Sequence, residues 1–520
     1  MFNFFTFSQP PIVEWHNIHD TWPKVFSYLD TQSLLNASLV CKSFNDYLST
    51  LDVLKKLKVF LIFPQFKEDF EASAAIIKKL QNRRHLTRNY KMLEIDKLQD
   101  FFLGIKTHEK GSEDSRSNLM RTFFKLSQSV ETLILKNCNI RQKNLMYTLR
   151  SFVNVRELVM DDVEFSAKYP PIEYSNVNIC LPKLKTLRLS KCDFFCLVIF
   201  KSHDNLECIE LSNLINVKTD MEILENFLLQ QKNLKKLKLQ NICLKKSLAF
   251  VPFQLTSLNL SPVTWETSGH FKQFAKSQKS LKSLTLKLSY RKVPPEETGL
   301  PLILQTLLKE NPRLESFSFE SVLHADMNNL DLLGGIVVPN ITQLSFNARD
   351  KNSRIFDDFT QAFTNIKCLK YYNYCEEHHD QIQHMDRFCE LEEFWLVGQP
   401  ADLRNAKIGS NRLKTFKYWG INEKKASTVL AEFIAQNPNI SDLSLFIEPI
   451  TFEQICEILM SISSTLEVFC CSDLHLDPPE TEIINQKFPR LRKLMSDFVL
   501  PQHIIEILNT KDIKFEKFES

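Results

Sequence analysis

Apolar residues recur along this chain with one spacing. In the segment VETLILKNCNI, Val130, Leu133, Leu135 and Ile140 are apolar, and Cys138 lies between the last two. This arrangement fits the pattern L-x-x-L-x-L-x-x-N/C-x-L. The same spacing returns fourteen times, beginning at Val155, Leu184, Leu206, Leu234, Leu255, Leu281, Leu314, Ile341, Ile366, Leu391, Leu413, Ile440, Leu466 and Leu491. The mean period of about 26 residues lies within the range of about 20–29 for leucine-rich repeats, so the pattern predicts a series of them over residues 121–520.

Each repeat predicts a strand, and several predict a helix as well. Within x-L-x-L-x the side chains alternate, so the leucines enter the core and the x positions face the other way. The segments TDMEILENFLLQQKN, PLILQTLLKENPR and ASTVLAEFIAQNPN have apolar residues at helical spacing. We therefore expect an α/β horseshoe with parallel strands on the concave side and helices on the convex side. Stacked repeats let a chain of 520 residues extend one core instead of dividing it.

The segment before the repeats has a helical pattern. In SLLNASLVCKSFNDYLSTL, Val40, Phe44, Tyr47 and Leu51 follow one another at i, i+4, i+7 and i+11 and line one helical face. The preceding PKVFSYL predicts a shorter helix with its proline in the first turn. A bundle of about 40 residues has little core of its own, so we expect one of its faces to bind a partner.

These residues resemble an F-box. In VFSYLDTQSLLNASLVCKSFNDYL, the positions that match the family are Phe26, Tyr28, Leu29, Leu34, Leu35, Ser38, Val40, Cys41 and Asn45. Two departures are visible: Asn17 and Ile18 stand where the family has Leu-Pro, and Phe44 stands where it has Trp. An F-box followed by leucine-rich repeats resembles the leucine-rich F-box proteins.

The resemblance implies a substrate-recognition subunit of a ubiquitin ligase. The F-box would dock on a Skp-type adaptor, and through it on a cullin, while the repeats hold a protein substrate. The candidate adaptor-binding residues are Phe26, Leu29, Leu34, Leu35, Val40, Cys41 and Phe44. Such a receptor needs no catalytic residue, because it contributes proximity to a bound conjugating enzyme. The alternative is a protein-binding scaffold or inhibitor with a degenerate F-box that is not coupled to ubiquitination.

The predicted organisation has four parts. Residues 1–12 form an N-terminal tail, residues 13–52 the F-box, residues 53–120 atypical capping repeats and residues 121–520 the leucine-rich repeats. Within the capping part, KTHEKGSEDSRSN over 106–118 has the composition of a flexible loop. Two imperfect repeats flank a predicted helix there, and their apolar residues are Leu57, Phe60 and Ile62, then Tyr90, Leu93 and Ile95.

Aromatic residues gather at the x positions of repeats ten to thirteen. We predict a substrate-binding surface made of Lys370, Tyr372, Trp395, Lys417, Trp419 and Phe446. Neighbouring strands lie about 4.8 Å apart, so these side chains would be continuous, and aromatic residues rimmed by charge are typical of interface hot spots. The two lysines favour an acidic or phosphorylated segment. Two alternatives remain: a register shift of one residue would bury the aromatic residues, and a C-terminal segment could cover them.

Composition argues against several classes of partner. Only 9 of 520 residues are glycine, and neither G-x-G-x-x-G nor G-x-x-x-x-G-K-[ST] occurs, so we expect no phosphate-binding loop. The 65 basic and 62 acidic residues nearly cancel, unlike the charge of dedicated nucleic-acid binders. No apolar run has the roughly 20 residues of a membrane span. We expect no nucleic acid and no membrane as partner, and localisation to the cytoplasm, the nucleus or both.

Groups that could act in catalysis or metal binding lack the required spacing. The 13 cysteines include no C-x-x-C pair. In CEEHHDQIQH, His379 and His384 are five residues apart, whereas H-E-x-x-H places two histidines four apart. His324 and His475 have no nucleophile or acid at the spacing of a triad. We therefore expect no catalytic residue, no metal and no cofactor.

Overall fold

The protein is described by a computed structural model. The described residues are 33, 58–62, 91–98, 127–165, 181–193, 196–200, 202–215, 221–244, 251–261, 263–265, 268–288, 300–321, 333–348, 355–373, 385–398, 403, 406, 408, 411–421, 426–448, 450–472 and 474–518. The chain consists of two compact units. The first contains residues 1–206 and 214–216, and the second contains residues 207–213 and 217–520.

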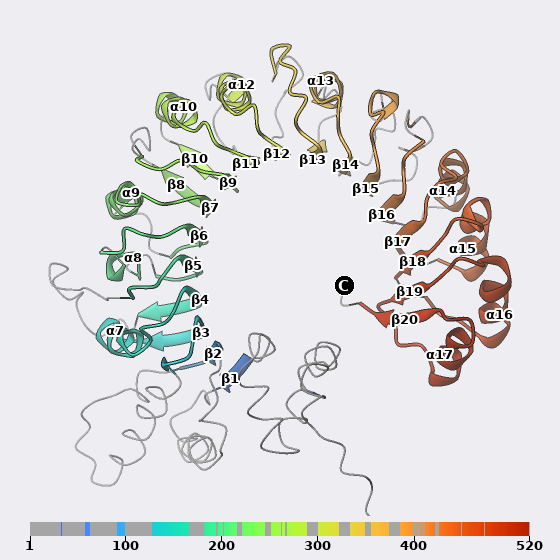
Figure 1. The fold of residues 1–520 in the computed structure, drawn as a ribbon, viewed down its shortest axis with the longest axis horizontal. Helices are drawn as coiled ribbons and strands as arrows, with labels where there is room; N and C mark the ends of the chain where they lie inside the picture. Colours follow the sequence, from blue (N-terminus) through green and yellow to red (C-terminus); the bar gives the residue numbers. More distant parts are fainter. Residues whose placement is uncertain are drawn as a thin grey trace, which may run out of the picture. The chain divides into compact units, whose positions relative to one another are not determined.

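The described part of the first unit is a parallel sheet with helices on one side (Figure 1). Its elements are β1 (Lys58–Ile62), β2 (Met92–Asp96), β3 (Thr132–Ile140), α7 (Gln142–Arg150), β4 (Glu157–Phe165), β5 (Thr186–Ser190) and α8 (Cys196–Ile199). The strands pair in chain order from β1 to β5. Strands β1 and β2 lie in the two imperfect repeats predicted between the modules.

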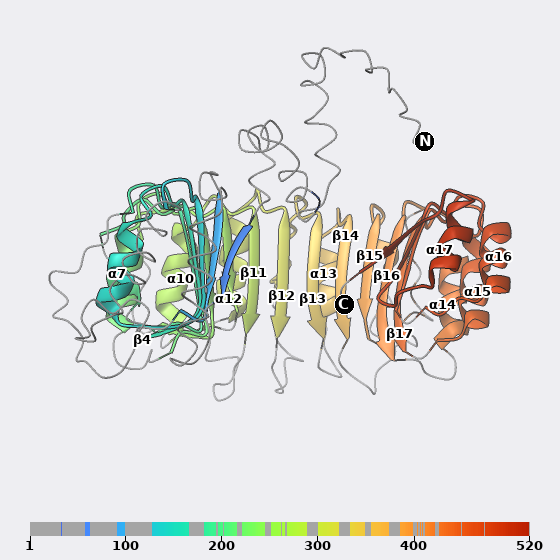
Figure 2. The same ribbon diagram turned by 90° about the horizontal axis from the view of Figure 1, so that it is seen from below.

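The second unit continues the same strand architecture. Its main sheet is parallel throughout and pairs in the order β6 (Cys208–Ser212), β7 (Lys236–Gln240), β9 (Ser257–Leu260), β11 (Ser283–Leu288), β12 (Ser316–Ser321), β13 (Gln343–Ala348), β14 (Cys368–Asn373), β15 (Glu393–Val397), β16 (Thr415–Ile421), β17 (Asp442–Glu448), β18 (Val468–Cys471), β19 (Lys493–Ser496) and β20 (Lys514–Lys517). A second small sheet joins β8 (Ile242–Leu244) to β10 (Val263–Trp265). Figure 2 shows β11 to β17 running side by side in one direction.

Helices of the second unit all lie on the same side of its sheet (Figure 1). They are α9 (Met221–Leu229), α10 (Ser268–Ser277), α12 (Leu300–Glu310), α13 (Ile355–Ala362), α14 (Ala426–Ala435), α15 (Phe452–Leu459), α16 (Pro478–Lys487) and α17 (Gln502–Asn509), with short 3-10 helices η8 (Met385–Arg387) and η10 (Met460–Ile462). The three helices predicted from the sequence correspond to α9, α12 and α14. Among the described residues of this unit, helices cover one face of the sheet and the other face carries none of them.

Burial explains why these segments form strands. Val130, Leu133 and Leu135 of the first predicted repeat have no exposed surface, while the intervening Thr132 and Ile134 are half-buried. The same alternation recurs in the second unit, for example in β15, where Phe394 and Leu396 have no exposed surface and the intervening Trp395 is half-buried. All of the predicted repeats contain a strand, so the α/β leucine-rich-repeat fold class is confirmed.

Small polar side chains complete the repeats where each strand ends. The thiols of Cys138 and Cys192, at the predicted N/C position, donate to the carbonyls of Lys136 and Ser190, with S–O distances of 3.0 and 3.2 Å. Directly before Cys138 and within β3, Asn137 has a φ of 49°, a left-handed conformation that asparagine tolerates better than most residues. Nine cysteines of the described part of the chain, Cys138 and Cys192 among them, form no disulfide.

Three strands were not predicted from the sequence. Strand β20 follows the last predicted repeat, and β8 and β10 form the small second sheet. The predicted F-box over 13–52 lies outside the described residues apart from Ser33, and the predicted loop over 106–118 lies outside them entirely. Among the residues that the structure describes, no helix has the length and apolar composition needed to cross a membrane.

Candidate protein-binding surface

The uncovered face of strands β14 to β17 carries the predicted surface residues. Leu369 and Tyr371 of β14 are fully buried, and the Tyr371 ring lies 5.6 Å from Phe356 of α13. Side chains alternate along a strand, so Lys370 and Tyr372 face away from the helices. Both are only half-buried. The predicted register is therefore confirmed, and the alternative of a one-residue shift is wrong.

Strand register brings the six predicted residues into two adjacent rows. The first row runs across β14, β15, β16 and β17 as Lys370, Trp395, Lys417 and Ser444. The second row runs across the same strands as Tyr372, Val397, Trp419 and Phe446. We call these two rows the aromatic face.

Trp395 lies between two ammonium groups. The Nζ atom of Lys370 is 3.7 Å from the centre of the Trp395 ring, and that of Lys417 is 4.1 Å from it. The indole Nε1 donates to Glu393, whose carboxylate also lies 3.9 Å from Lys417 Nζ. Each cation–π contact contributes about 0.5–1 kcal/mol at an exposed site. The indole ring is thus held in one orientation before any partner arrives.

At the end of the second row, Trp419 and Phe446 form a cluster of three aromatic rings with Phe518. Trp419 is 58% exposed, the largest exposed fraction among the aromatic residues of the described chain for which exposure is given. Its ring centroid lies 5.3 Å from that of Phe446. Phe446 in turn contacts Phe518, which follows β20, edge to face at 5.6 Å. The predicted possibility of a C-terminal cover is thus realised at Phe446, while Trp419 stays open.

Two glycines fix the ends of the strands that carry the tryptophans. The amide of Gly398 donates to the carbonyl of Trp419 over 2.9 Å, and the hydroxyl of Tyr418 donates to the carbonyl of Gly398 over 2.8 Å. A Cβ atom on Gly420 would lie 2.0 Å from that hydroxyl and 2.3 Å from the Gly398 carbonyl. Glycine at 420 therefore allows the tyrosine hydroxyl to pass under the strand and join β15 to β16.

Charge on this part of the sheet is balanced. Two carboxylates, Glu393 of β15 and Asp442 of β17, lie beside the first row. Each of them pairs in register with Thr415 of β16, the strand between them. Burial raises the pKa of Asp442, Lys417 opposes that rise and Glu393 adds to it. Burial likewise raises the pKa of the Cys368 thiol to about 12, so this thiol is neutral at physiological pH. The face offers ring surfaces and paired charges rather than a nucleophile.

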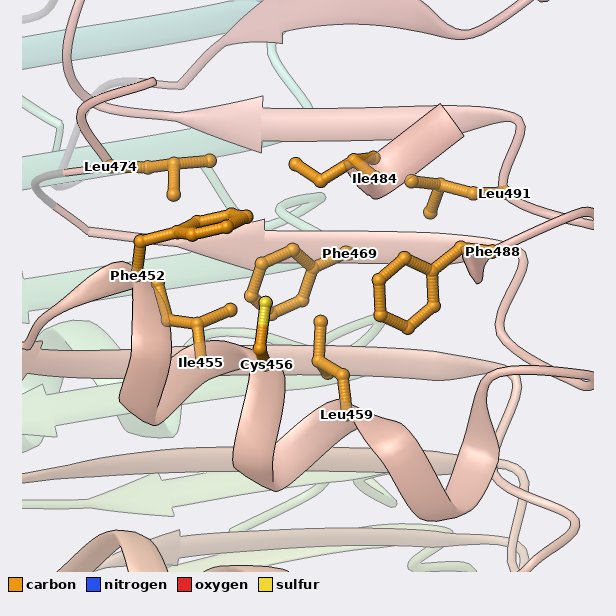
Figure 3. Close-up of a pocket in the computed structure, with 9 residues that line it drawn as sticks. All are labelled: Phe452, Ile455, Cys456, Leu459, Phe469, Leu474, Ile484, Phe488 and Leu491. Atoms are coloured by element: carbon orange, nitrogen blue, oxygen red, sulfur yellow. The ribbon is translucent and has the colours of Figure 1, made fainter. Parts of the chain in front are cut away.

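Two hollows elsewhere fit a ligand less well. Nine apolar side chains of the C-terminal repeats, Cys456, Phe469 and Ile484 among them, surround about 10 Å3 of free space (Figure 3). That volume barely holds one water, and its lining offers no polar partner. In the first unit, a polar hollow of about 210 Å3 is lined by groups that bond one another, such as Lys91 to Glu131 and Lys183 to Asn154. Within the described ranges, no group of three potential ligands is placed to hold a metal.

Most of the other predicted residues lie outside the described part of the chain. His324, His379 and His384 are among them. So are the seven adaptor-binding candidates, which are Phe26, Leu29, Leu34, Leu35, Val40, Cys41 and Phe44. His475 is described, is exposed and contacts Phe498 in a tilted arrangement, with 4.2 Å between ring centroids and 52° between ring planes. Sequence reasoning missed Phe518 and Gly420, because nothing local in the sequence indicates that either one reaches the aromatic face.

A comparison with protein families bears on the N-terminal part. Residues 19–56 match a family model described as F-box-like. The chain contains an F-box-like segment. The F-box-like segment overlaps the predicted F-box over 13–52 and includes all seven adaptor-binding candidates. No curated protein sequence matches the chain.

Solved structures with some likeness to the chain include two examples. The functional domain of InlJ from Listeria monocytogenes, which includes a cysteine ladder, is 11% identical, with a TM-score of 0.25 over 76% of this chain and 74% of that chain. A chain in the crystal structure of the Rad7 and Elc1 complex in yeast is 13% identical, with a TM-score of 0.29 over 96% of each chain. The fold assignment rests on the register and burial of this chain's own strands.

Proposed function

We propose that this protein is the substrate-recognition subunit of a Skp-cullin-F-box type ubiquitin ligase. The F-box-like segment would bind a Skp-type adaptor and, through it, a cullin, while the aromatic face binds the substrate protein. The protein would work in the cytoplasm, the nucleus or both, without catalytic residues of its own. The match over residues 19–56, followed by repeats with an open sheet face, supports this proposal.

The aromatic face has the composition of a protein interface. Large rings at its centre and charged groups beside them are typical of hot spots, where single side chains contribute about 2 kcal/mol or more. Trp395 is immobilised by its two lysines, so little conformational entropy remains to be lost when it binds. Lys370 and Lys417 remain available to an acidic or phosphorylated segment, since each ammonium carries three donors.

Adaptor binding is tested by deletion. A pull-down with the full chain should recover a Skp-type adaptor and a cullin, and a chain that lacks residues 1–52 should recover neither. The repeats should still melt at a similar temperature, because the deletion ends before β1 (Lys58–Ile62). Recovery of other proteins without adaptor or cullin would instead favour the alternative of a scaffold or inhibitor with a degenerate F-box.

Substrate binding is tested on the aromatic face. The double substitution Trp395→Ala with Trp419→Ala should lower the recovery of substrate proteins at least about tenfold, given the usual contribution of aromatic anchors. Phe498→Ala is the matched control, because Phe498 is an exposed aromatic residue at 41% that lies off this face. Unchanged recovery at an unchanged melting temperature would remove the aromatic face from the proposal.

A further inference from the structure

The chain's own C-terminal segment places an aromatic ring on the aromatic face. After β20, the amide of Phe518 donates to the carbonyl of Ser496 at the end of β19 over 3.0 Å. The Phe518 ring then contacts Phe446 of β17, with 5.6 Å between centroids and 89° between ring planes. The Phe518 ring thus reaches a ring of β17, which lies three strands from β20 in the pairing order.

Two small side chains lie next to Phe446 in the sheet, Cys470 on β18 and Ser472 directly after it. Cys470 is in register with Ser444, and the amide of Ser472 donates to the carbonyl of Leu445. This pairing places Ser472 beside Phe446, where β16 has Trp419 on the other side. We call the surface formed by Trp419, Phe446 and Ser472 the Phe446 socket.

Phe518 occupies this socket by a contact that is easily exchanged. Both Phe446 and Phe518 remain half-buried. One edge-to-face ring pair strengthens an association by about two- to tenfold. The preceding strand is held independently, by its pairing with β19 and by an ion pair of 2.6 Å between Lys493 and Glu516. The ring can therefore leave while the strand stays in place.

We infer that the Phe446 socket binds an aromatic side chain of the substrate protein, and that Phe518 is the intramolecular occupant which that side chain displaces. The inference rests on the proposed function, because it names the anchor that a substrate would present to the aromatic face. An edge-on ring is the occupant that the socket already accepts. The adjacent Lys–Trp–Lys stack would then lie against the residues that flank the aromatic anchor.

The socket is tested with N-acetyl-L-phenylalaninamide as the probe. The full chain is labelled with 5-fluorotryptophan, and the fluorine resonance of Trp419 is assigned by comparison with Trp419→Phe. In the Phe518→Ala variant, the probe should shift this resonance with a midpoint about two- to tenfold lower than in the unchanged chain. Phe518→Leu retains an apolar side chain next to β20 and should give an intermediate midpoint.

Controls separate the socket from the proposed function. Phe498→Ala removes an exposed ring elsewhere and should leave the midpoint unchanged. Equal midpoints for the unchanged chain and Phe518→Ala, or no shift of the Trp419 resonance in either, would overturn the inference. If the probe behaves as expected but Trp395→Ala with Trp419→Ala captures the same substrates, the socket accepts a free ring but the aromatic face is removed from the proposed function. If capture falls but the probe fails, the socket alone is wrong.

Discussion

Single polar side chains accept hydrogen bonds from backbone N–H groups of a neighbouring repeat, and one of these side chains is a histidine. In the second unit, the amide oxygens of Gln278 and Asn311 accept from the backbone N–H groups of Leu255 and Leu281 over 2.9 and 2.8 Å. In the first unit, Nε2 of His203 accepts in the same way from Leu181 over 3.1 Å. An imidazole nitrogen can accept only when it carries no proton.

His203 should therefore make stability depend on pH. Burial lowers the pKa of His203 from its ordinary value of 6.5, against smaller opposing effects of Phe200 and Asp204. The unfolded chain then binds the proton more readily than the folded chain. The contribution to the free energy of unfolding is complete above pH 6.5 and is lost as the pH falls from there to the lower folded pKa.

The measurement is urea unfolding at pH 7.5, 6.5 and 5.5. His203→Gln retains a side-chain acceptor of the kind found at Gln278 but does not titrate in this range. The free energy of unfolding of the variant should therefore fall less between pH 7.5 and pH 5.5 than that of the unchanged chain. Identical losses in the two proteins would show that His203 does not carry this dependence.

At the scale of strands, the hydrogen bond from the Tyr418 hydroxyl of β16 to the Gly398 carbonyl after β15 depends on a glycine at position 420. A methyl group there would meet the Tyr418 hydroxyl at 2.0 Å and the Gly398 carbonyl at 2.3 Å. Gly420→Ala should lower the free energy of unfolding by about 1–3 kcal/mol, as overpacking of a filled core does. Adding Tyr418→Phe removes the nearer of the two atoms, so the double variant should be more stable than the sum of the two single effects.

A glycine with free space serves as the control. A Cβ atom on Gly335 would meet nothing within 4 Å, although its φ is 69°. Gly335→Ala therefore reports the cost of backbone conformation without a clash, about 1–2 kcal/mol. Additive effects of Gly420→Ala and Tyr418→Phe in chemical unfolding would contradict the predicted contact.

Strands were predictable where two buried residues alternate with half-buried ones, as at Phe394 and Leu396 of β15. The same alternation gave the aromatic face its register, because a period of two assigns every x position to one side. Strand β20 escaped prediction because its sequence KFEK has burial that is only partial at Phe515 and Glu516. The position of the two ammonium groups over Trp395 also escaped, since it depends on neighbouring strands that are far apart in sequence.

For the whole molecule, the sequence predicted the class of fold but not the contacts between distant repeats. Phe518 reaches Phe446 only because the last repeats bring residues some seventy positions apart into contact, and no spacing in the sequence encodes that path. The F-box-like segment was predictable by resemblance, through matching positions such as Phe26 and Leu29. Its binding residues depend on a partner's shape, which the sequence of this chain does not contain.

The stacking of the repeats should also determine how far a loss of local stability extends through the second unit. Phe359 of α13 is fully buried and lies 5.9 Å from Phe317 of β12 and 5.1 Å from Phe346 of β13. Phe359→Ala should cost about 3–5 kcal/mol of local stability. Because a repeat packs chiefly against its neighbours, amide hydrogen exchange should accelerate in β12, β13 and β14 while β18 and β19 keep their protection. Phe498→Ala, at an exposed ring, should change exchange only in its own loop, and equal acceleration from β12 to β19 after Phe359→Ala would mean that the second unit unfolds as one cooperative block.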